Sequence, residues 1–225
     1  MQQKITCYCD NVFEVDVPRE INLDSNSEYF DQIQNGTFLN FTCQACKKNH
    51  KPEFPLVVFW PSRKLCIEVL SELQRGEFYR RKTAPELTGD YDLQNLDIQT
   101  FDIQTLIGYP ELADRLAVLK SGFEPAAVEA IKYFLHLKAE EQYPDEEIDI
   151  WYHYETGGAA DNFLHFHIHG LRKNEVAAAK IPRSVYEKTL SDYKNNPKSD
   201  RFSALKVLGY LSVKNMMRSD TRTKT

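Results

Sequence analysis

The sequence predicts an α+β protein, with an N-terminal antiparallel β lobe, then a pair of helices, then a second antiparallel β-hairpin and C-terminal helices. Three observations lead to this fold class. Strand-like segments flank two close cysteine pairs within the first 50 residues. Two segments after residue 109 each carry a proline at a helix start and apolar residues at helical spacing. Residues 148–171 alternate apolar and polar side chains around a glycine-containing turn, which indicates a hairpin.

The composition is that of a globular protein with a core. Hydrophobic residues make up 42% of the 225 residues and charged residues 27%, which excludes a disordered chain. The net charge of −5 argues against a nucleic-acid partner, because phosphate contacts need a clustered basic surface. No apolar run approaches the roughly 18 residues of a membrane span. Because the chain starts without an apolar leader segment, we expect a cytoplasmic protein, in which disulfides are rare.

Residues 1–70 are predicted to form the first, mostly antiparallel β lobe. A short helix fits within 24–34, which is polar with spaced apolar residues. The apolar runs 56–60 and 65–70 form a hairpin around the turn 61–64. We expect this hairpin to continue the sheet that the cysteine pairs close.

Residues 101–218 are predicted to form a second, α+β lobe. The polar segment 71–100 is expected to connect it to the first lobe, and 219–225 to be a polar tail. Residues 103–108 have the pattern of a strand. The second lobe would therefore begin with a strand and continue into helices.

Two helices are expected after this strand. Pro110 has the favoured first-turn position of a helix in which Leu112, Leu116 and Leu119 recur at helical spacing. A second helix begins near Pro125 and has a broad apolar face.

A second hairpin is expected from strands at 148–155 and 163–171, joined by a turn at 156–161. Residues 175–181 have the pattern of a further short strand. Pro182 then opens a helix that ends before Pro197. The segment 205–217 is apolar enough to pack against the rest of the protein.

Four cysteines form two pairs, Cys7 with Cys9 and Cys43 with Cys46. Two turns that each deliver two thiolates make a tetrahedral four-sulfur site of the zinc-ribbon kind, and zinc suits thiolate ligands. The second pair has the usual spacing of two residues, whereas the first pair is one residue short. In a straight strand the sulfurs of the first pair would start about 6.6 Å apart. A local bend is therefore needed to bring them to the sulfur separation of about 3.8 Å that zinc imposes.

Other interpretations of the cysteines stay open. They can be a disulfide pair or thiols without a ligand role. His50, four residues after Cys46, can replace one ligand or can be a solvated turn residue. Cys66 lies in an apolar run and is predicted to be a small buried side chain.

Three histidines alternate along 163–171, at positions 165, 167 and 169. His165 and His167 can bind one metal ion with His153 from the partner strand, and Glu155 or Asp161 can add a carboxylate. An open coordination position would then activate water. The alternatives are that these histidines form the solvated polar face of the sheet, or a patch that changes charge near neutral pH.

The sequence resembles the CpXC family, whose members are prokaryotic and are named for Cys-Pro-x-Cys pairs. The resemblance rests on several segments: Lys4-Ile5-Thr6-Cys7, Val12-Phe13-Glu14-Val15, Asn35-Gly36-Thr37-Phe38, Phe41-Thr42-Cys43-x-x-Cys46, the 56–70 hairpin, Ile107 to Leu116, and Val128-Glu129-Ala130-Ile131-Lys132. The first pair lacks the proline and one spacer residue, and Gln44 replaces the proline of the second. The resemblance implies a β domain that carries the four-cysteine site of Cys7, Cys9, Cys43 and Cys46, here called the clip, followed by helices. It implies no catalysis.

These observations favour a non-enzymatic zinc-binding protein in which a structural four-cysteine clip supports a surface for a protein partner. No nucleophile elbow, phosphate loop or HExxH motif is present. Two alternatives remain. One is a metal-dependent hydrolase centred on His153, His165 and His167, and the other is a thiol redox sensor that uses Cys7 and Cys9.

Overall fold

The computed structural model describes residues 1–83, 100–144, 146–154 and 162–223. The chain divides into two compact units, residues 1–113 and 114–225. The division falls inside helix α3 (Tyr109–Lys120), whereas the sequence analysis places a connector at 71–100. Residues 84–99 of that connector lie outside the described residues, and the predicted lobe boundaries stay a prediction.

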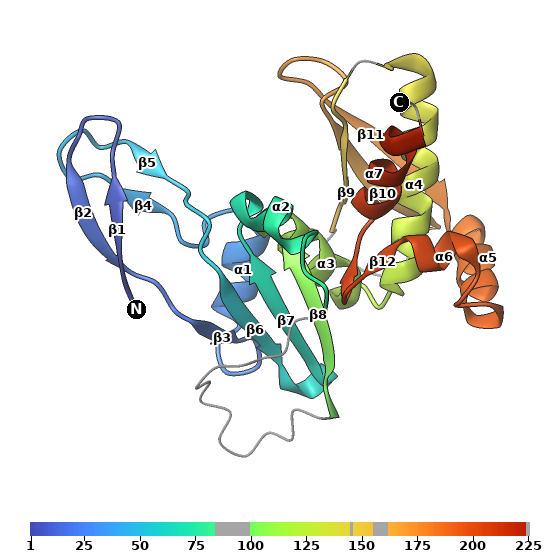
Figure 1. Cartoon of the computed structure of the whole chain (residues 1–225), viewed down its shortest axis with the longest axis horizontal. Coiled ribbons are helices and arrows are strands. Elements are labelled where there is room, and N and C mark those ends of the chain that lie inside the picture. Colours follow the sequence, from blue (N-terminus) through green and yellow to red (C-terminus); the bar gives the residue numbers. More distant parts are fainter. Residues whose placement is uncertain (84–99, 145, 155–161, 224–225) are drawn as a thin grey trace. The chain divides into compact units, whose positions relative to one another are not determined.

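The first unit contains two small antiparallel hairpins (Figure 1). One consists of β1 (Gln2–Thr6) and β2 (Val12–Asp16), with Ile5 opposite Phe13. The other consists of β4 (Phe41–Thr42) and β5 (Asn49–His50). Each hairpin carries one cysteine pair in its turn, as the sequence predicts.

The larger sheet of the first unit contains β3 (Glu20–Asn22), β6 (Leu56–Trp60), β7 (Leu65–Leu70) and β8 (Asp102–Ile107), in the order β8-β7-β6-β3. The antiparallel β6–β7 hairpin is as predicted, but β3 runs parallel to β6 and β8 runs parallel to β7. The hairpin therefore does not continue the sheet of the cysteine turns, and that prediction was wrong. The physical reason is that β6 and β7 are buried on both faces, which is typical of strands inside a sheet rather than at its end.

Short helices complete the first unit. They are α1 (Glu28–Gln34), the 3-10 turns η1 (Pro61–Arg63) and η2 (Glu72–Gln74), and α2 (Arg75–Phe78). The helix α1 confirms the short helix expected within 24–34. Cys66 on β7 is fully buried in a cluster with Val57 and Phe59, as the sequence predicts.

The second unit is built on a three-stranded antiparallel sheet. Its strands are β9 (Asp149–Tyr152), β10 (Phe163–His169) and β11 (Val176–Pro182), in the order β11-β10-β9. The predicted hairpin of 148–155 and 163–171 is thus confirmed for its described residues, and 175–181 adds the third strand. The expected turn at 156–161 lies outside the described residues.

Two long helices, α4 (Pro125–Gln142) and α5 (Arg183–Asn195), pack against one face of this sheet. The core between them contains eleven buried residues: Val118, Ala127, Val128, Ile131, Ala139, Ile148, Ile150, Leu164, Phe166, Ile168 and Tyr186. Alternation along β10 directs Leu164, Phe166 and Ile168 into this core, whereas the three histidines and the exposed Phe163 lie on the opposite face. The pattern predicted from the sequence is confirmed here.

Short elements end the second unit: α6 (Asp200–Ala204), β12 (Lys206–Val207), β13 (Tyr210–Leu211) and α7 (Lys214–Thr223). The helix α7 extends into the segment 219–225 that the sequence analysis treats as a polar tail. Across the described parts of the chain, no helix combines the length and the apolar content needed to cross a membrane.

Candidate metal centre

Two tight turns of similar construction hold the four cysteines. In the β1–β2 turn, the Asp10 N–H donates to the Cys7 carbonyl at 2.9 Å. In the β4–β5 turn, the Lys47 N–H donates to the Cys43 carbonyl, also at 2.9 Å. Asp10 and Lys47 each follow the second cysteine of their pair, and both have a left-handed backbone, with φ of 63° and 62°. The first turn is one residue shorter, and the bend that its short spacing requires is present.

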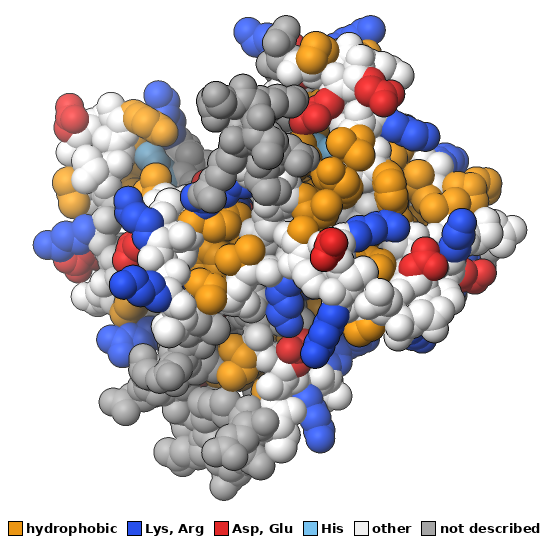
Figure 2. All heavy atoms as spheres, turned by 45° about the vertical axis from the view of Figure 1, so that its right-hand side comes forward, with side chains coloured by type: hydrophobic (Ala, Val, Ile, Leu, Met, Phe, Trp, Pro, Cys, Tyr) orange, Lys and Arg blue, Asp and Glu red, His pale blue; other side chains and the backbone are white. Residues whose placement is uncertain are grey.

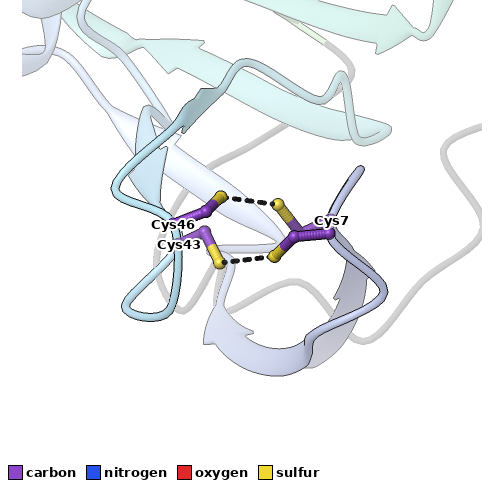
Figure 3. A group of neighbouring side chains, drawn as sticks. Cys7, Cys43 and Cys46 are labelled. Atoms are coloured by element: carbon purple, nitrogen blue, oxygen red, sulfur yellow. Dashed lines mark hydrogen bonds between the residues drawn. The ribbon is translucent and has the colours of Figure 1, made fainter.

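The four sulfurs converge between the two turns. The ligand atoms of Cys7, Cys9, Cys43 and Cys46 all lie within 4.8 Å of one another. Cys7 Sγ lies 3.4 Å from Cys46 Sγ, and Cys9 Sγ lies 3.8 Å from Cys43 Sγ. Figure 3 shows the side chains of Cys43 and Cys46 directed toward the turn that carries Cys7. All four cysteines are free thiols, with no disulfide among them.

This arrangement fits a tetrahedral metal ion. A zinc ion with Zn–S bonds of about 2.3 Å separates its sulfurs by about 3.8 Å, which matches the closest sulfur pairs. Cys7 and Cys43 are buried, Cys46 is half-buried and Cys9 is exposed. The cluster can therefore hold a metal ion close to the surface.

Two neighbouring side chains contact the sulfurs. The sequence analysis names His50 as a possible substitute ligand and does not foresee Asn11. The Asn11 amide donates to Cys43 Sγ at 3.5 Å, and His50 Nε2 lies 3.1 Å from Cys7 Sγ. The His50 ring also stacks on Tyr8, with ring centroids 5.6 Å apart. His50 is half-buried and held in place, rather than a solvated turn residue. The available sequence signal for Asn11 was its position two residues after Cys9.

The surroundings give the thiols different acidities. Backbone N–H groups of Cys46 and Ala45, with the Asn11 amide, lower the pKa of Cys43 to about 6 against the opposing effect of burial. The backbone N–H of Cys9 lowers the pKa of Cys7, but burial and hydrogen bonds to the other thiols outweigh it and raise that pKa to about 12. Of these two thiols, Cys43 is thus the better prepared to bind a cation as thiolate.

The histidine face of the second unit offers a weaker set of ligands. The His153 N–H donates to the His165 carbonyl at 2.9 Å, and the His153 and His167 rings lie 4.3 Å apart. Burial and the neighbouring histidines lower the pKa of His167. Within the described residues, the four cysteines are the one group of three or more metal-ligating side chains brought together. Glu155 and Asp161 lie outside those residues, so the hydrolase hypothesis stays a prediction.

A buried ionic cluster in the second unit was not foreseen. Lys132 on α4 forms ion pairs with Asp114 and with Glu129, the latter at 2.8 Å, and all three side chains are buried. Asp114 also accepts the Tyr152 N–H of β9, and Glu129 accepts the Val213 N–H. Despite burial, the two carboxylates raise the pKa of Lys132, which keeps it charged. Because solvent does not reach these groups, the cluster ties elements together rather than forming a reaction site.

Comparison with known proteins bears on both the cysteines and this cluster. A model of the CpXC protein family matches residues 5–132. An uncharacterized protein of Treponema pallidum (strain Nichols) is 27% identical over 215 residues, which cover 95% of this chain and 97% of that protein. No solved structure matches the chain. The family match spans more than half of the chain, including both cysteine pairs and the ionic cluster, and confirms the resemblance: the chain belongs to the CpXC family.

Proposed function

We propose that this chain is a zinc-binding protein without enzymatic activity, in which the four-cysteine clip fixes a surface for a protein partner. The observation that supports zinc is the convergence of four free thiols from two turns. Thiolate ligands in tetrahedral geometry suit zinc or iron. We choose zinc because it is not redox-active and its d-electrons impose no coordination geometry of their own.

The closed ligand set supports a structural role for the metal. Four protein thiolates complete the tetrahedral coordination of zinc and leave no position for water or substrate. The metal would then contribute to folding rather than to a reaction. Among the described residues, neither the buried ionic cluster nor the histidine face adds a second group of three or more metal ligands.

The turn of the first hairpin supplies the surface that we assign to a protein partner. Tyr8, between the two cysteines, is 86% exposed, and Val12 is 56% exposed. The Tyr8 ring stacks on His50, and Lys48 Nζ lies 5.9 Å from its centroid. An exposed aromatic side chain that is already held in place loses little entropy on binding, and tyrosine is enriched at interface hot spots.

Charge distribution favours a protein over a nucleic acid as this partner. On the face viewed in Figure 2, basic and acidic side chains are interspersed with hydrophobic ones. A nucleic-acid surface needs basic side chains gathered in a stripe or patch. The net charge of −5 acts in the same direction. The cytoplasmic location expected from the sequence stays a prediction.

Elemental analysis of the untagged protein tests the metal. We expect one zinc per chain in the native protein and none in Cys43→Ser. Cys66→Ala is the matched control, because it removes the buried thiol of β7 and should retain the full zinc content. Finding iron instead of zinc would correct the assigned identity of the metal. Absence of metal from protein prepared under reducing conditions would contradict the proposal.

A thiol redox sensor is the second candidate, and one observation favours it. Cys9 is exposed and its sulfur lies 3.8 Å from that of Cys43, while the Cys7 sulfur lies 3.4 Å from that of Cys46. Oxidation would therefore link the two turns, Cys7 to Cys46 and Cys9 to Cys43, rather than join Cys7 to Cys9. Peptide mapping after mild oxidation of the metal-free protein distinguishes these linkages, and a thiol count insensitive to oxidant would exclude the sensor.

A further inference from the structure

The outer edge of β11 has no partner strand among the described residues. The sheet order β11-β10-β9 leaves β11 at one end. The strand is seven residues long, Val176 to Pro182, and its single charged residue is Lys180. Long edge strands with few charges are uncommon in monomeric proteins, because their free N–H and C=O groups can pair with another chain.

Hydrogen-bond alternation identifies the groups on this edge. The Arg183 N–H donates to the Asn162 carbonyl at 2.7 Å, in register with the β10–β11 pairs. Hydrogen-bonded pairs recur at every second residue of an antiparallel ladder. Residues 177, 179 and 181 therefore bond to β10, whereas the N–H and C=O groups of residues 176, 178 and 180 point away from it. On the outward side of Pro182 there is a carbonyl and no N–H.

At the opposite edge of the same sheet, an outward amide is hydrogen-bonded within the fold. On β9, Tyr152 directs its N–H away from β10, and Asp114 Oδ1 accepts this group at 2.5 Å. That carboxylate belongs to the buried ionic cluster around Lys132. The two edges therefore differ: side chains of the fold satisfy the outward amide of Tyr152, whereas no described group contacts the outward amides of β11.

We propose that β11 is a homodimer interface, in which two copies of the chain pair their β11 strands antiparallel around a two-fold axis at Ala179. Each sheet of three strands would become half of a continuous sheet of six. This inference is independent of the metal clip, because it rests on the second unit alone.

The strand is complementary to a second copy of itself in this register. Ala178 and Lys180 of one copy would face Lys180 and Ala178 of the other, and both pairs would exchange two hydrogen bonds. Val176 would donate to the Pro182 carbonyl, so that the missing proline N–H falls at the end of the ladder. No two lysines face each other. A strand contact of this size lies at the small end of specific interfaces, so we expect a dissociation constant on the order of 10 µM.

Side chains on the inner face also suit this pairing. Ala177, Ala179 and Ile181 are half-buried against the core of the second unit. In the dimer Ala179 would face its own copy and Ala177 would face Ile181. Small side chains permit the close approach of non-hydrogen-bonded pairs, and their remaining apolar surface would be buried.

Sedimentation and amide exchange test the interface on the full chain. Sedimentation equilibrium over a concentration series around the expected dissociation constant should show a monomer–dimer equilibrium. Amide exchange followed by NMR should show protection of residues 178 and 180 that increases with concentration, whereas residues 177, 179 and 181 are protected throughout. A chain that stays monomeric overturns the proposal, and so does a dimer in which residues 178 and 180 exchange freely.

A matched pair of substitutions provides the second test. Ala178 is exposed, so neither change should alter the fold, and thermal melting at low concentration checks this. Ala178→Lys would place a lysine opposite Lys180 twice in the dimer and should weaken association about tenfold. Ala178→Glu would place a carboxylate there and should preserve or strengthen it. Equal dissociation constants for the two variants would overturn the assigned register.

Discussion

The cysteine hairpins and the second unit are stabilised by different physical means. Across residues 2–16 and 41–50, the buried side chains are Ile5, Cys7 and Cys43. The second unit instead buries a cluster of eleven apolar or aromatic side chains between its sheet and helices. Two-stranded hairpins without a core are marginally stable in water, so the hairpins need a cross-link that the second unit does not need. The comparison gives a physical reason for four cysteines, which could hold a metal ion, to lie together in this part of the chain.

Metal removal should separate the two regions most strongly. Chelation, or Cys46→Ser, removes a structural site whose binding free energy is on the order of 10 kcal/mol. We expect the amides of β1, β2, β4 and β5 to lose protection in hydrogen exchange, while β10 stays protected. Mass spectrometry of peptides from the two regions measures this. Hairpins that stay protected without metal would show that they have another source of stability.

Loss of the buried lysine should affect the second unit instead. Lys132→Met leaves the carboxylates of Asp114 and Glu129 buried without their cation, which costs about 3–5 kcal/mol. Lys138→Met, on the exposed face of the same helix, is the matched control and should be nearly neutral. Chemical unfolding followed by Trp151 fluorescence gives the free energy, in a Trp60→Phe background. Zinc content should be the same in both variants, and a zinc loss in Lys132→Met would contradict the separation.

Acid should destabilise the second unit through His136. Burial lowers the pKa of this α4 histidine to about 4. The charges of Lys132 and Lys214 also lower it, whereas those of Asp149 and Glu129 raise it. The unfolded chain takes up a proton below pH 6.5, which the folded chain resists. Stability is therefore lost as pH falls from 6.5 toward 4, by about 2 kcal/mol between pH 8 and pH 5. The unfolding free energy of the native protein should show this loss, and His136→Gln should lack that part of it. Parallel pH profiles for the two proteins would assign the acid sensitivity elsewhere.

Local patterns in the sequence were sufficient for much of the fold. Alternation along 163–171 located β10 and the faces of its side chains, and Pro110 and Pro125 lie in the first turns of α3 and α4. The parallel pairing of β3 with β6 and of β8 with β7 was missed. These pairs join segments far apart in the chain, and residue periodicity carries no information on which strands meet.

The candidate site was predictable in its ligands and not in its surroundings. Cysteine spacing indicated the cluster, because two close cysteine pairs in two turns are the usual arrangement of a four-thiolate metal site. The contact of Asn11 with Cys43 Sγ depends on turn geometry that no spacing rule gives, whereas the spacing of His50 from Cys46 indicated only a possible replacement ligand. Charged residues such as Lys132 are mostly exposed, so their burial here could not be inferred from residue type. The helices that carry these residues were predicted, and the family match extends to residue 132.

The smallest expected effect concerns the support of the metal ligands. Asn11→Ala removes the amide that donates to Cys43 Sγ, while the backbone hydrogen bond from Cys7 N–H to the Asn11 carbonyl remains available. Groups that hold metal ligands in place are typically worth 10–100-fold in affinity, and we expect about tenfold because the hydrogen bond is long. Asn49→Ala is the control, since Asn49 bonds the Thr42 hydroxyl in the neighbouring hairpin and touches no sulfur. Competition with a zinc chelator measures both affinities. Equal zinc affinities for the two variants would mean that the backbone of the two turns positions the thiolates without help from the Asn11 side chain.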